Sequence, residues 1–305
     1  MFIFPGFILL AGIFTGTQAS GADSSHQPVF VVERSFGTFA DAVSLSTNGS
    51  GDFFVVDAGA DKLYQLSESD GNIKSIGGKG WGDLEFDQPS DVCASFPLDV
   101  YVADYNNRRV QRFDRKLNLI QSFTEENLPS SSNGSFYPRA CAMSLQGELF
   151  VVESESDRIL KFDQNQNFQK EFGSYSAGAG TLKTPRDISI NSGDTVFILD
   201  EHRVVEFDIF GNYVGSIALP QADTALALST FGGGVLVSMA SAIAAYSSDG
   251  TPLFIITRSR IVGFPPPNGL HQDEEIRDAL LLSSKLFILT NHTILMGNTA
   301  VGKER

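Results

Sequence analysis

One short pattern recurs along this chain and restricts what it can fold into. An apolar run ends on an acid, a turn follows, and a second apolar run opens on a base. Three stretches align without gaps, FFVVDAGADKLYQL (53–66), VYVADYNNRRVQRF (100–113) and LFVVESESDRILKF (149–162), and VFILDEHRVVEF (196–207) aligns with a turn two residues shorter. VLVSMASAIAAY (235–246) and LFILTNHTILM (286–296) keep the apolar runs and lose the charges. A repeat spacing of roughly 40–50 residues is typical of propeller blades.

Each repeat also carries a strand-like segment ahead of this pair of runs. These leading segments are FADAVSLS, PSDVCAS, PRACAMS, PRDISI, TALALS and RDALLLS. The first five repeats carry a further segment behind the pair, and these are NIKSIG, NLIQSF, NFQKEF, NYVGSI and PLFIIT. The segments are rich in β-branched and aromatic residues and are bounded by Gly, Asn, Asp and Ser, which indicates strands joined by tight turns. The sequence therefore supplies six sets of three strands but only five outer strands behind them.

The missing outer strand is found at the start of the repeats. PVFVVERSFG (28–37) has the outer-strand pattern and no inner strands ahead of it. If it completes the sixth blade, the ring closes and only short, protected edges remain. We predict an all-β chain, a six-bladed β-propeller of four-stranded antiparallel blades over residues 28–298, closed by this N-terminal outer strand.

The repeats resemble those of NHL-repeat six-bladed propellers, within the TolB-like propeller superfamily. The resemblance rests mainly on GGKGWGDLEFDQPSDV (77–92) running into VYVADYNNRRVQRFD, with its glycine-spaced loop, Phe-x-x-Pro step, acid-terminated strand and Asn-x-Arg return. GAGTLKTPRDI (178–188) repeats the loop. The fifth and sixth repeats depart from the pattern, because Ser238 and Thr290 replace the acid and Ala242 and Thr293 replace the base.

The first 22 residues form an apolar run followed by the small-residue triplets TQA and SGA, which a signal peptidase would cut after residue 22 or residue 19. No Lys or Arg precedes the run, so a buried helix or a retained membrane anchor stays open. We expect an exported protein, periplasmic or secreted, with a linker at 23–27, a tail at 299–305 and no transmembrane span in the mature chain.

Charge and cysteine usage exclude several classes of function. A net charge of −14 makes nucleic acid an unlikely partner, because Lys and Arg must neutralise phosphates. Two cysteines without a Cys-x-x-Cys motif exclude zinc ribbons and haem attachment. Cys93 and Cys141 occupy equivalent stretches of adjacent repeats; two buried thiols are the favoured interpretation, and a disulfide between them stays open.

The acid and base that bracket the turns are a structural feature in our interpretation. A catalytic pair is normally single, whereas this one recurs in four repeats. The two ends face each other in a hairpin, so the acid can accept hydrogen bonds from the turn or pair with the base. The four pairs are Asp57 with Lys62, Asp104 with Arg109, Glu153 with Arg158, and Asp200 with Arg203.

One face of the predicted propeller gathers the candidate binding residues. Loops that lead into the inner strands and turns between second and third strands share this face, around the mouth of the channel. Its candidate residues are Asp41, Asp91, Arg139, Arg186, Asp187, Arg277, Asp278, Tyr105, His202 and His292. No catalytic motif accompanies them, so we expect a binding or scaffold protein without a cofactor, with a protein partner or a small-molecule ligand.

A metal-dependent hydrolase or lyase is the alternative, because related six-bladed propellers place a metal in the channel. The chain has only four histidines, His26, His202, His271 and His292, which leaves carboxylates as the main candidate ligands. Calcium prefers such oxygen ligands. The set that could surround it is Asp41, Asp91, Asp187 and Asp278.

Overall fold

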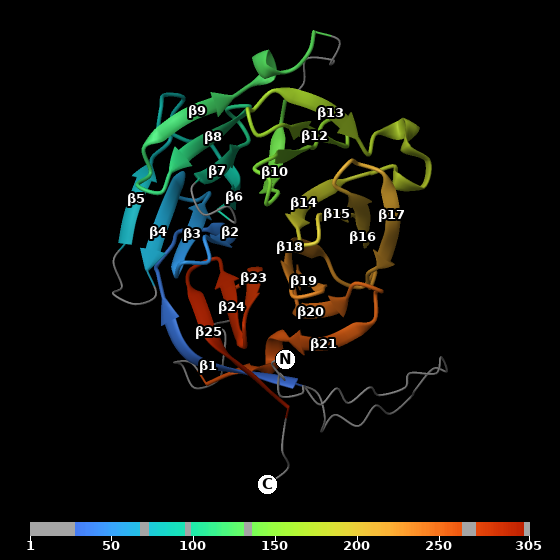
Figure 1. Cartoon of the computed structure of the whole chain (residues 1–305). Helices are drawn as coiled ribbons and strands as arrows, with labels where there is room; N and C mark the ends of the chain where they lie inside the picture. Colours follow the sequence, from blue (N-terminus) through green and yellow to red (C-terminus); the bar gives the residue numbers. More distant parts are fainter. Residues whose placement is uncertain (1–27, 68–72, 95–98, 131–135, 264–272, 302–305) are drawn as a thin grey trace, which may run out of the picture.

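Six β-sheets stand around a central channel in the computed structural model, which describes residues 28–67, 73–94, 99–130, 136–263 and 273–301 (Figure 1). The predicted six-bladed propeller is thereby confirmed. The predicted signal peptide (1–22) and linker (23–27) lie outside the described residues.

The first five blades run outward from the channel in chain order, each with four strands. Blade 1 is β2 (Ala42–Thr47), β3 (Asp52–Asp57), β4 (Lys62–Ser67) and β5 (Ile73–Gly77). Blade 2 is β6 (Pro89–Cys93), β7 (Asp99–Asp104), β8 (Arg109–Asp114) and β9 (Leu119–Phe123), and blade 3 is β10 (Pro138–Met143), β11 (Leu149–Glu153), β12 (Arg158–Phe162) and β13 (Phe168–Phe172). Blade 4 is β14 (Pro185–Ile190), β15 (Thr195–Asp200), β16 (Arg203–Asp208) and β17 (Tyr213–Ala218), and blade 5 is β18 (Ala225–Phe231), β19 (Gly234–Met239), β20 (Ala242–Ser247) and β21 (Pro252–Thr257).

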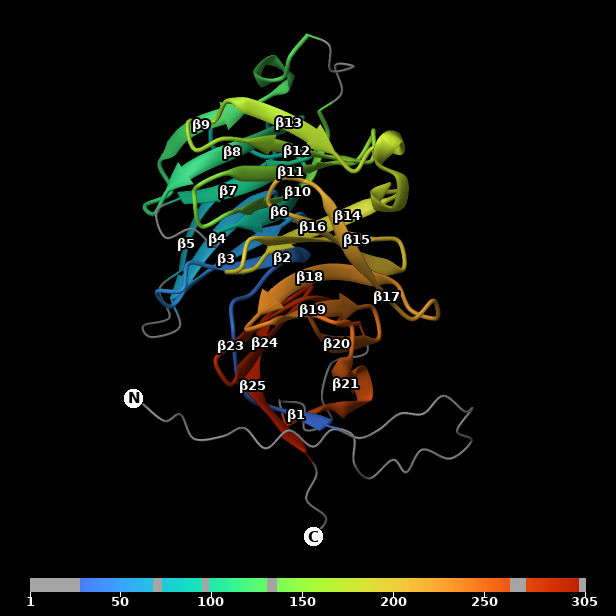
Figure 2. The same ribbon diagram turned by 45° about the vertical axis from the view of Figure 1, so that its right-hand side comes forward.

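Blade 6 joins the two ends of the chain. From the channel outward its first three strands are β23 (Ile276–Leu282), β24 (Lys285–Thr290) and β25 (Ile294–Val301). Its outer strand is β1 (Pro28–Phe36), as predicted. β1 pairs antiparallel with β25 from Pro28 opposite Val301 to Phe36 opposite Ile294. The pairing carries β25 to Val301, three residues past the predicted end of the propeller. Figure 2 shows β1 and β25 crossing at the base of the ring.

One strand was not predicted. β22 (Ile261–Val262) adds to the free edge of β1 as a short parallel strand, so the closing sheet has five strands. It follows a 3₁₀ turn at Arg258–Arg260; two others lie at Glu125–Asn127 and Tyr175–Gly180. Residues 264–272, between β22 and β23, lie outside the described residues. No helix in the described part of the chain has the length and apolar character to cross a membrane.

The core lies between neighbouring blades, because each strand turns one side chain row towards the next sheet. Phe30 of β1 is fully buried and packs with Ile243 and Ile256 of blade 5 and Ile288 of blade 6. The aromatic rings of Phe53 (blade 1) and Phe287 (blade 6) lie 4.7 Å apart across the next interface. Apolar burial on this scale drives ring closure.

Candidate functional site

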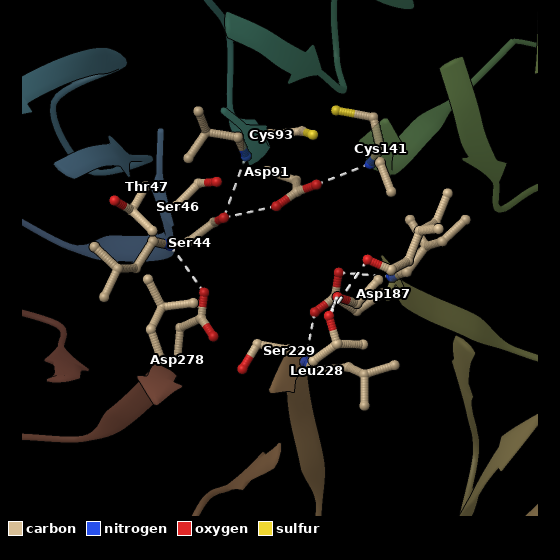
Figure 3. A pocket seen from close by; sticks show the side chains of 18 of the residues that line it. Ser44, Ser46, Thr47, Asp91, Cys93, Cys141, Asp187, Leu228, Ser229 and Asp278 are labelled. Carbon is tan, nitrogen blue, oxygen red and sulfur yellow. Dashed lines mark hydrogen bonds between the residues drawn. The ribbon is translucent and has the colours of Figure 1, made fainter. Parts of the chain in front are cut away.

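Two cavities follow the central channel. The mouth cavity, of about 100 Å³, lies where the inner strands begin, and the channel cavity, of about 160 Å³, lies further along them. Ser44, Asp91, Asp187 and Asp278 line both. In Figure 3 these side chains point into the channel from different inner strands.

Every inner strand, the strand next to the channel, contains a β-bulge. The bulge determines which side chains line the mouth and which point into the channel. In β6, Pro89 pairs with Asp104 and Asp91 with Ala103, so Ser90 is the extra residue. An extra residue bends a strand and redirects its side chains. The same shift occurs in all six inner strands. The six extra residues line the mouth cavity alone, and they are Val43, Ser90, Arg139, Arg186, Leu226 and Arg277.

The aspartates that follow the bulges tie neighbouring blades together. Each of the three accepts a hydrogen bond from a backbone N–H of the next inner strand, in blades 3, 5 and 1 in turn. The bonds join Asp91 to Cys141, Asp187 to Leu228 and Asp278 to Leu45, at 2.8, 2.6 and 2.8 Å. A buried backbone N–H without a partner is destabilising, so these carboxylates contribute to the stability of the ring.

Two further hydrogen-bond arrangements occur at the other interfaces between blades. The Ser44 hydroxyl accepts from the N–H of Val92 at 3.2 Å and donates to Asp91 at 2.6 Å. Blades 3 and 5 offer only alanine at this position, and there Asp187 and Asp278 accept from the N–H of the residue that follows each of them, both at 2.7 Å. Every oxygen of the three carboxylates therefore has a donor.

Burial makes ionisation of these aspartates unfavourable. It raises the pKa of Asp278 to about 7, and the charge of Asp91 adds to the shift. Burial raises the pKa of Asp187 well above its usual range, and the charges of Asp91 and Asp278 raise it further. Burial likewise raises the pKa of Asp91, against the opposing effect of its hydrogen bonds and of Arg139. Three like charges around one channel repel one another, so protonation relieves the ring.

The arginines at the rim differ in their partners. Arg277 donates to Asp41 at 2.9 Å and contacts Glu275 at 3.1 Å. Arg139 and Arg186 are exposed, and neither forms an ion pair with another described residue. These two guanidinium groups are therefore available to a ligand at the mouth.

The predicted ring of ten candidate residues is divided by the structure. Six of them line the mouth cavity: Asp91, Arg139, Arg186, Asp187, Arg277 and Asp278. Asp41 reaches the rim through its ion pair with Arg277. The prediction placed the aspartates at the rim, but the bulge turns Asp91 and Asp278 inwards, where they are buried.

The three candidates from the hairpin turns lie outside the mouth cavity. Tyr105 packs on Tyr137 with ring centroids 5.6 Å apart, and the Arg108 guanidinium lies 4.8 Å from the Tyr137 ring centroid. His292 Nδ1 lies 3.2 Å from the carbonyl oxygen of Phe39. His202 is exposed in the turn between β15 and β16. They do not contribute to the channel site.

The acids that end the second strands anchor the loops ahead of the inner strands. All four are fully buried and accept N–H groups from these loops, and three pair with their bases. The ion pairs are Asp104 with Arg109 at 2.9 Å, Glu153 with Arg158 at 3.2 Å, and Asp200 with Arg203 at 2.8 Å. Lys62 stands opposite Asp57 in register without an ion pair between them.

The two cysteines face the same channel. Both thiols are buried and no disulfide joins them, although Cys93 and Cys141 lie on adjacent inner strands (Figure 3). Burial, followed by the charge of Asp91, raises the pKa of the Cys141 thiol well above its usual range. A thiol in this environment is a poor nucleophile.

The predicted calcium ligands do not fit a cation site. Asp41 is turned to Arg277, and every oxygen of Asp91, Asp187 and Asp278 accepts a hydrogen bond from the chain. Within the ranges that the structure describes, no three His, Cys, Asp or Glu side chains are placed to hold a metal ion.

Comparisons with known proteins give partial sequence matches and a full structural one. No protein-family model matches the chain. It is 30% identical over 132 residues (42% of the chain) to Protein brain tumor of Drosophila melanogaster, and 29% identical over 199 residues (62%) to the probable peptidyl-alpha-hydroxyglycine alpha-amidating lyase pgal-1 of Caenorhabditis elegans. These matches span 12% and 53% of the two relatives.

A solved streptogramin B lyase superposes with a TM-score of 0.63 at 14% identity, over 89% of this chain and 98% of that one, which supports the fold alone. The chain is a six-bladed β-propeller. The sequence matches support the resemblance of its repeats to NHL repeats.

Sequence reasoning missed two residues of this propeller. Ser44, like the three aspartates, is a polar side chain in the channel that hydrogen-bonds one blade to the next. Its alignment with Asp91 in the next repeat was the sequence signal that could have identified it. Trp81, within the loop that carries the NHL resemblance, is 78% exposed. Its exposure could not be predicted from the sequence of a loop whose Phe86 is fully buried.

Proposed function

We propose that this six-bladed propeller is a non-catalytic binding protein that recognises a partner at the channel mouth. The observation that carries the proposal is the pair of exposed guanidinium groups, Arg139 and Arg186, without ion pairs to other described residues. A guanidinium presents a planar fork that matches a carboxylate with two hydrogen bonds. The class of partner is therefore a protein or small molecule that presents carboxylates.

The channel below these arginines supports a structural role for its acids. The carboxylates of Asp91, Asp187 and Asp278 accept backbone N–H groups that fasten one blade to the next. Withdrawing any of them for proton transfer would break a contact between blades. The rim, where side chains are not needed for ring closure, is the part that can vary with the partner. The apolar N-terminal run makes a location outside the cytoplasm part of the proposal.

The test removes the two arginines and asks whether a partner is lost. The tagged full chain, its R139A/R186A variant and an R115A/K116A variant are used to co-purify proteins from the native source, which are quantified by mass spectrometry. Arg115 and Lys116 lie in the turn between β8 and β9, at the opposite face, and match the charge that is removed. A partner retained by the control and lost by R139A/R186A supports the proposal. Equal recovery by all three proteins contradicts it.

The alternative is a metal-dependent lyase, which the match to an amidating lyase over 199 residues favours. The arrangement of the channel carboxylates argues against a metal-dependent lyase, because their oxygens accept hydrogen bonds from N–H groups and from the Ser44 hydroxyl. Elemental analysis of protein purified without chelator, together with an assay on a peptidyl-α-hydroxyglycine, distinguishes the two. One equivalent of bound metal with turnover would favour the lyase, and metal well below one equivalent without turnover would favour the binding protein.

A further inference from the structure

The only tryptophan of the chain lies on the surface. Trp81 is 78% exposed, on the loop between β5 and β6. Tryptophan is highly buried on average in folded proteins, and one exposed indole removes a large apolar area from the core. The ring makes no aromatic or cation contact with any other described side chain. Folding of the propeller therefore does not explain the indole at this position.

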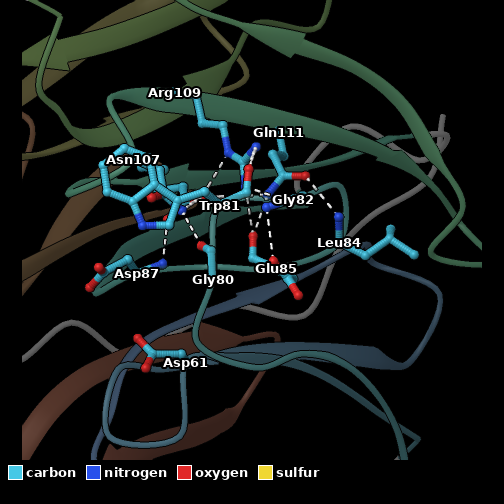
Figure 4. Close-up of polar contacts among 12 residues, drawn as sticks. Asp61, Gly80, Trp81, Gly82, Leu84, Glu85, Asp87, Asn107, Arg109 and Gln111 are labelled. Atoms are coloured by element: carbon cyan, nitrogen blue, oxygen red, sulfur yellow. Dashed lines mark hydrogen bonds and ion pairs between the residues drawn. The ribbon is translucent and has the colours of Figure 1, made fainter.

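The backbone around Trp81 is held rigidly. The buried Arg109 guanidinium donates to the carbonyls of Trp81, Gly82 and Glu85, at 3.1, 2.8 and 2.8 Å. The fully buried Gln111 donates to the same Glu85 carbonyl at 2.8 Å. Figure 4 shows both side chains reaching from β8 into the loop. A rigid loop loses little conformational entropy when it binds, which favours an anchor residue at its tip.

Two glycines flank the tryptophan, and the Glu85 side chain lies against both of them. The carboxylate of Glu85 folds beneath the loop and accepts the N–H of Gly82 at 2.8 Å. A Cβ at Gly80 would require that carboxylate to shift. Asn107 adds a donor to the Gly80 carbonyl at 2.8 Å. The loop is thus fixed on both sides of Trp81, while the indole itself stays in solvent.

The surroundings of the indole are acidic. Asp83 and Glu85 are exposed in the same loop, and the Lys79 ammonium is 3.7 Å from Asp87. The Arg109 charge is countered by the Asp104 carboxylate at 2.9 Å. The whole chain carries a net charge of −14. Among aromatic rings the indole is the best acceptor for a cation placed over its face.

We propose that Trp81 anchors a second contact surface, which takes an arginine- or lysine-bearing segment of a protein partner. The surface consists of Trp81, Asp83 and Glu85. It lies on the same face as the channel mouth, because its loop is bonded to the start of β8, but it shares no residue with the mouth cavity. The surface is separate from the contact assigned to Arg139 and Arg186, and it can be tested on its own.

The probe is a labelled 12-residue peptide of alternating arginine and glycine, with a glutamate–glycine peptide as its counterpart. Binding to the full chain is followed by anisotropy of the label and by Trp81 fluorescence, which reports this site alone because the chain has no other tryptophan. We expect the arginine peptide to bind and to change the indole emission. W81A should weaken binding by about fivefold or more, the change that corresponds to a cation over an indole.

Two controls make the result specific. L145A removes an exposed apolar side chain in the turn between β10 and β11, on the opposite face, and should leave the affinity unchanged. R139A/R186A should bind the arginine peptide as well as the parent or better, because it removes two positive charges. Equal affinity of W81A and the parent would show diffuse attraction to an acidic protein and overturn the proposal. Absence of binding, or its loss in R139A/R186A, would overturn it as well.

Discussion

Acidification from about pH 8 to about pH 5 should stabilise the folded protein, and Asp278 should account for a large part of the effect. Its pKa is about 7 in the folded channel and 3.8 as an ordinary carboxyl. A group whose pKa is raised by folding contributes stability below its unfolded pKa and loses that contribution as the pH rises through the folded pKa. For Asp278 the loss falls between about pH 4 and about pH 7.

The size of the effect follows from the two pKa values. Near pH 8 Asp278 is ionised in both states, whereas near pH 5 it is protonated in the folded state and still ionised in the unfolded chain. Linkage then gives a gain of about 2–3 kcal/mol in the free energy of unfolding. The pKa values of Asp91 and Asp187 are raised as well, so their contributions have the same sign.

Other carboxylates act in the opposite sense, but at lower pH. The turn aspartates Asp114, Asp163, Asp208 and Asp249 have lowered pKa values, because they accept hydrogen bonds within their turns. The stability that they contribute is lost only below their ordinary pKa of 3.8. They therefore do not oppose the channel aspartates between pH 5 and pH 8. Burial also raises the pKa values of Asp104, Asp157 and Glu206, whose contributions have the same sign as that of Asp278.

The assay is urea denaturation followed by circular dichroism at several pH values and constant ionic strength, for the parent and for D278N. Asparagine keeps one acceptor and cannot ionise, so D278N should lose about 2 kcal/mol of the stabilisation between pH 8 and pH 5. The difference between the two pH values is the measured quantity, because the amide also changes stability at every pH. A parent whose stability does not change with pH, or an equal gain in D278N, would refute the reasoning.

Three further predictions follow from packing and burial. F30A should lower the free energy of unfolding by about 3–5 kcal/mol, because Phe30 fills the core that closes the ring. V31A, at an exposed position, should change it by about 0.5 kcal/mol or less. Chemical denaturation measures both variants, and equal effects would contradict closure by β1. R109A should destabilise by about 3–5 kcal/mol in the same assay, since it leaves Asp104 buried without its cation, and a loss below about 1 kcal/mol would show that the pair is dispensable. Both thiols should resist an alkylating reagent near pH 8 in the native protein and react on unfolding, because Cys141 is buried with a raised pKa; rapid labelling of the native protein would count against this burial.

The architecture could be predicted from the sequence because the patterns that indicate it are local and occur in every repeat. Alternating apolar residues, turn residues and the acid at the end of each second strand fix the strands within one repeat. The lone outer strand at 28–37 could be assigned to blade 6 by counting alone, and β1 pairs with β25 as expected. β22 escaped notice, since two residues that add to an edge carry no periodicity.

The site depended on contacts between repeats, which the sequence does not contain. The Pro-x-Asp motif placed Arg186 and Asp187 side by side, yet a one-residue bulge directs the first to the rim and the second into the channel. The residue after the bulge is an acid in some repeats and alanine or serine in others, so the repeats did not reveal its role in joining the blades. Asp187 reaches the N–H of Leu228, 41 residues further on, only when blade 5 packs beside blade 4.

The sequence by itself determined a closed ring of six blades, because strand formation and apolar burial depend on patterns of a few residues that each repeat displays. Tertiary structure alone decided which polar groups are consumed by the fold and which are left for a ligand. Hydrogen bonding and desolvation depend on distances between blades, and these distances exist only once the blades have packed against one another.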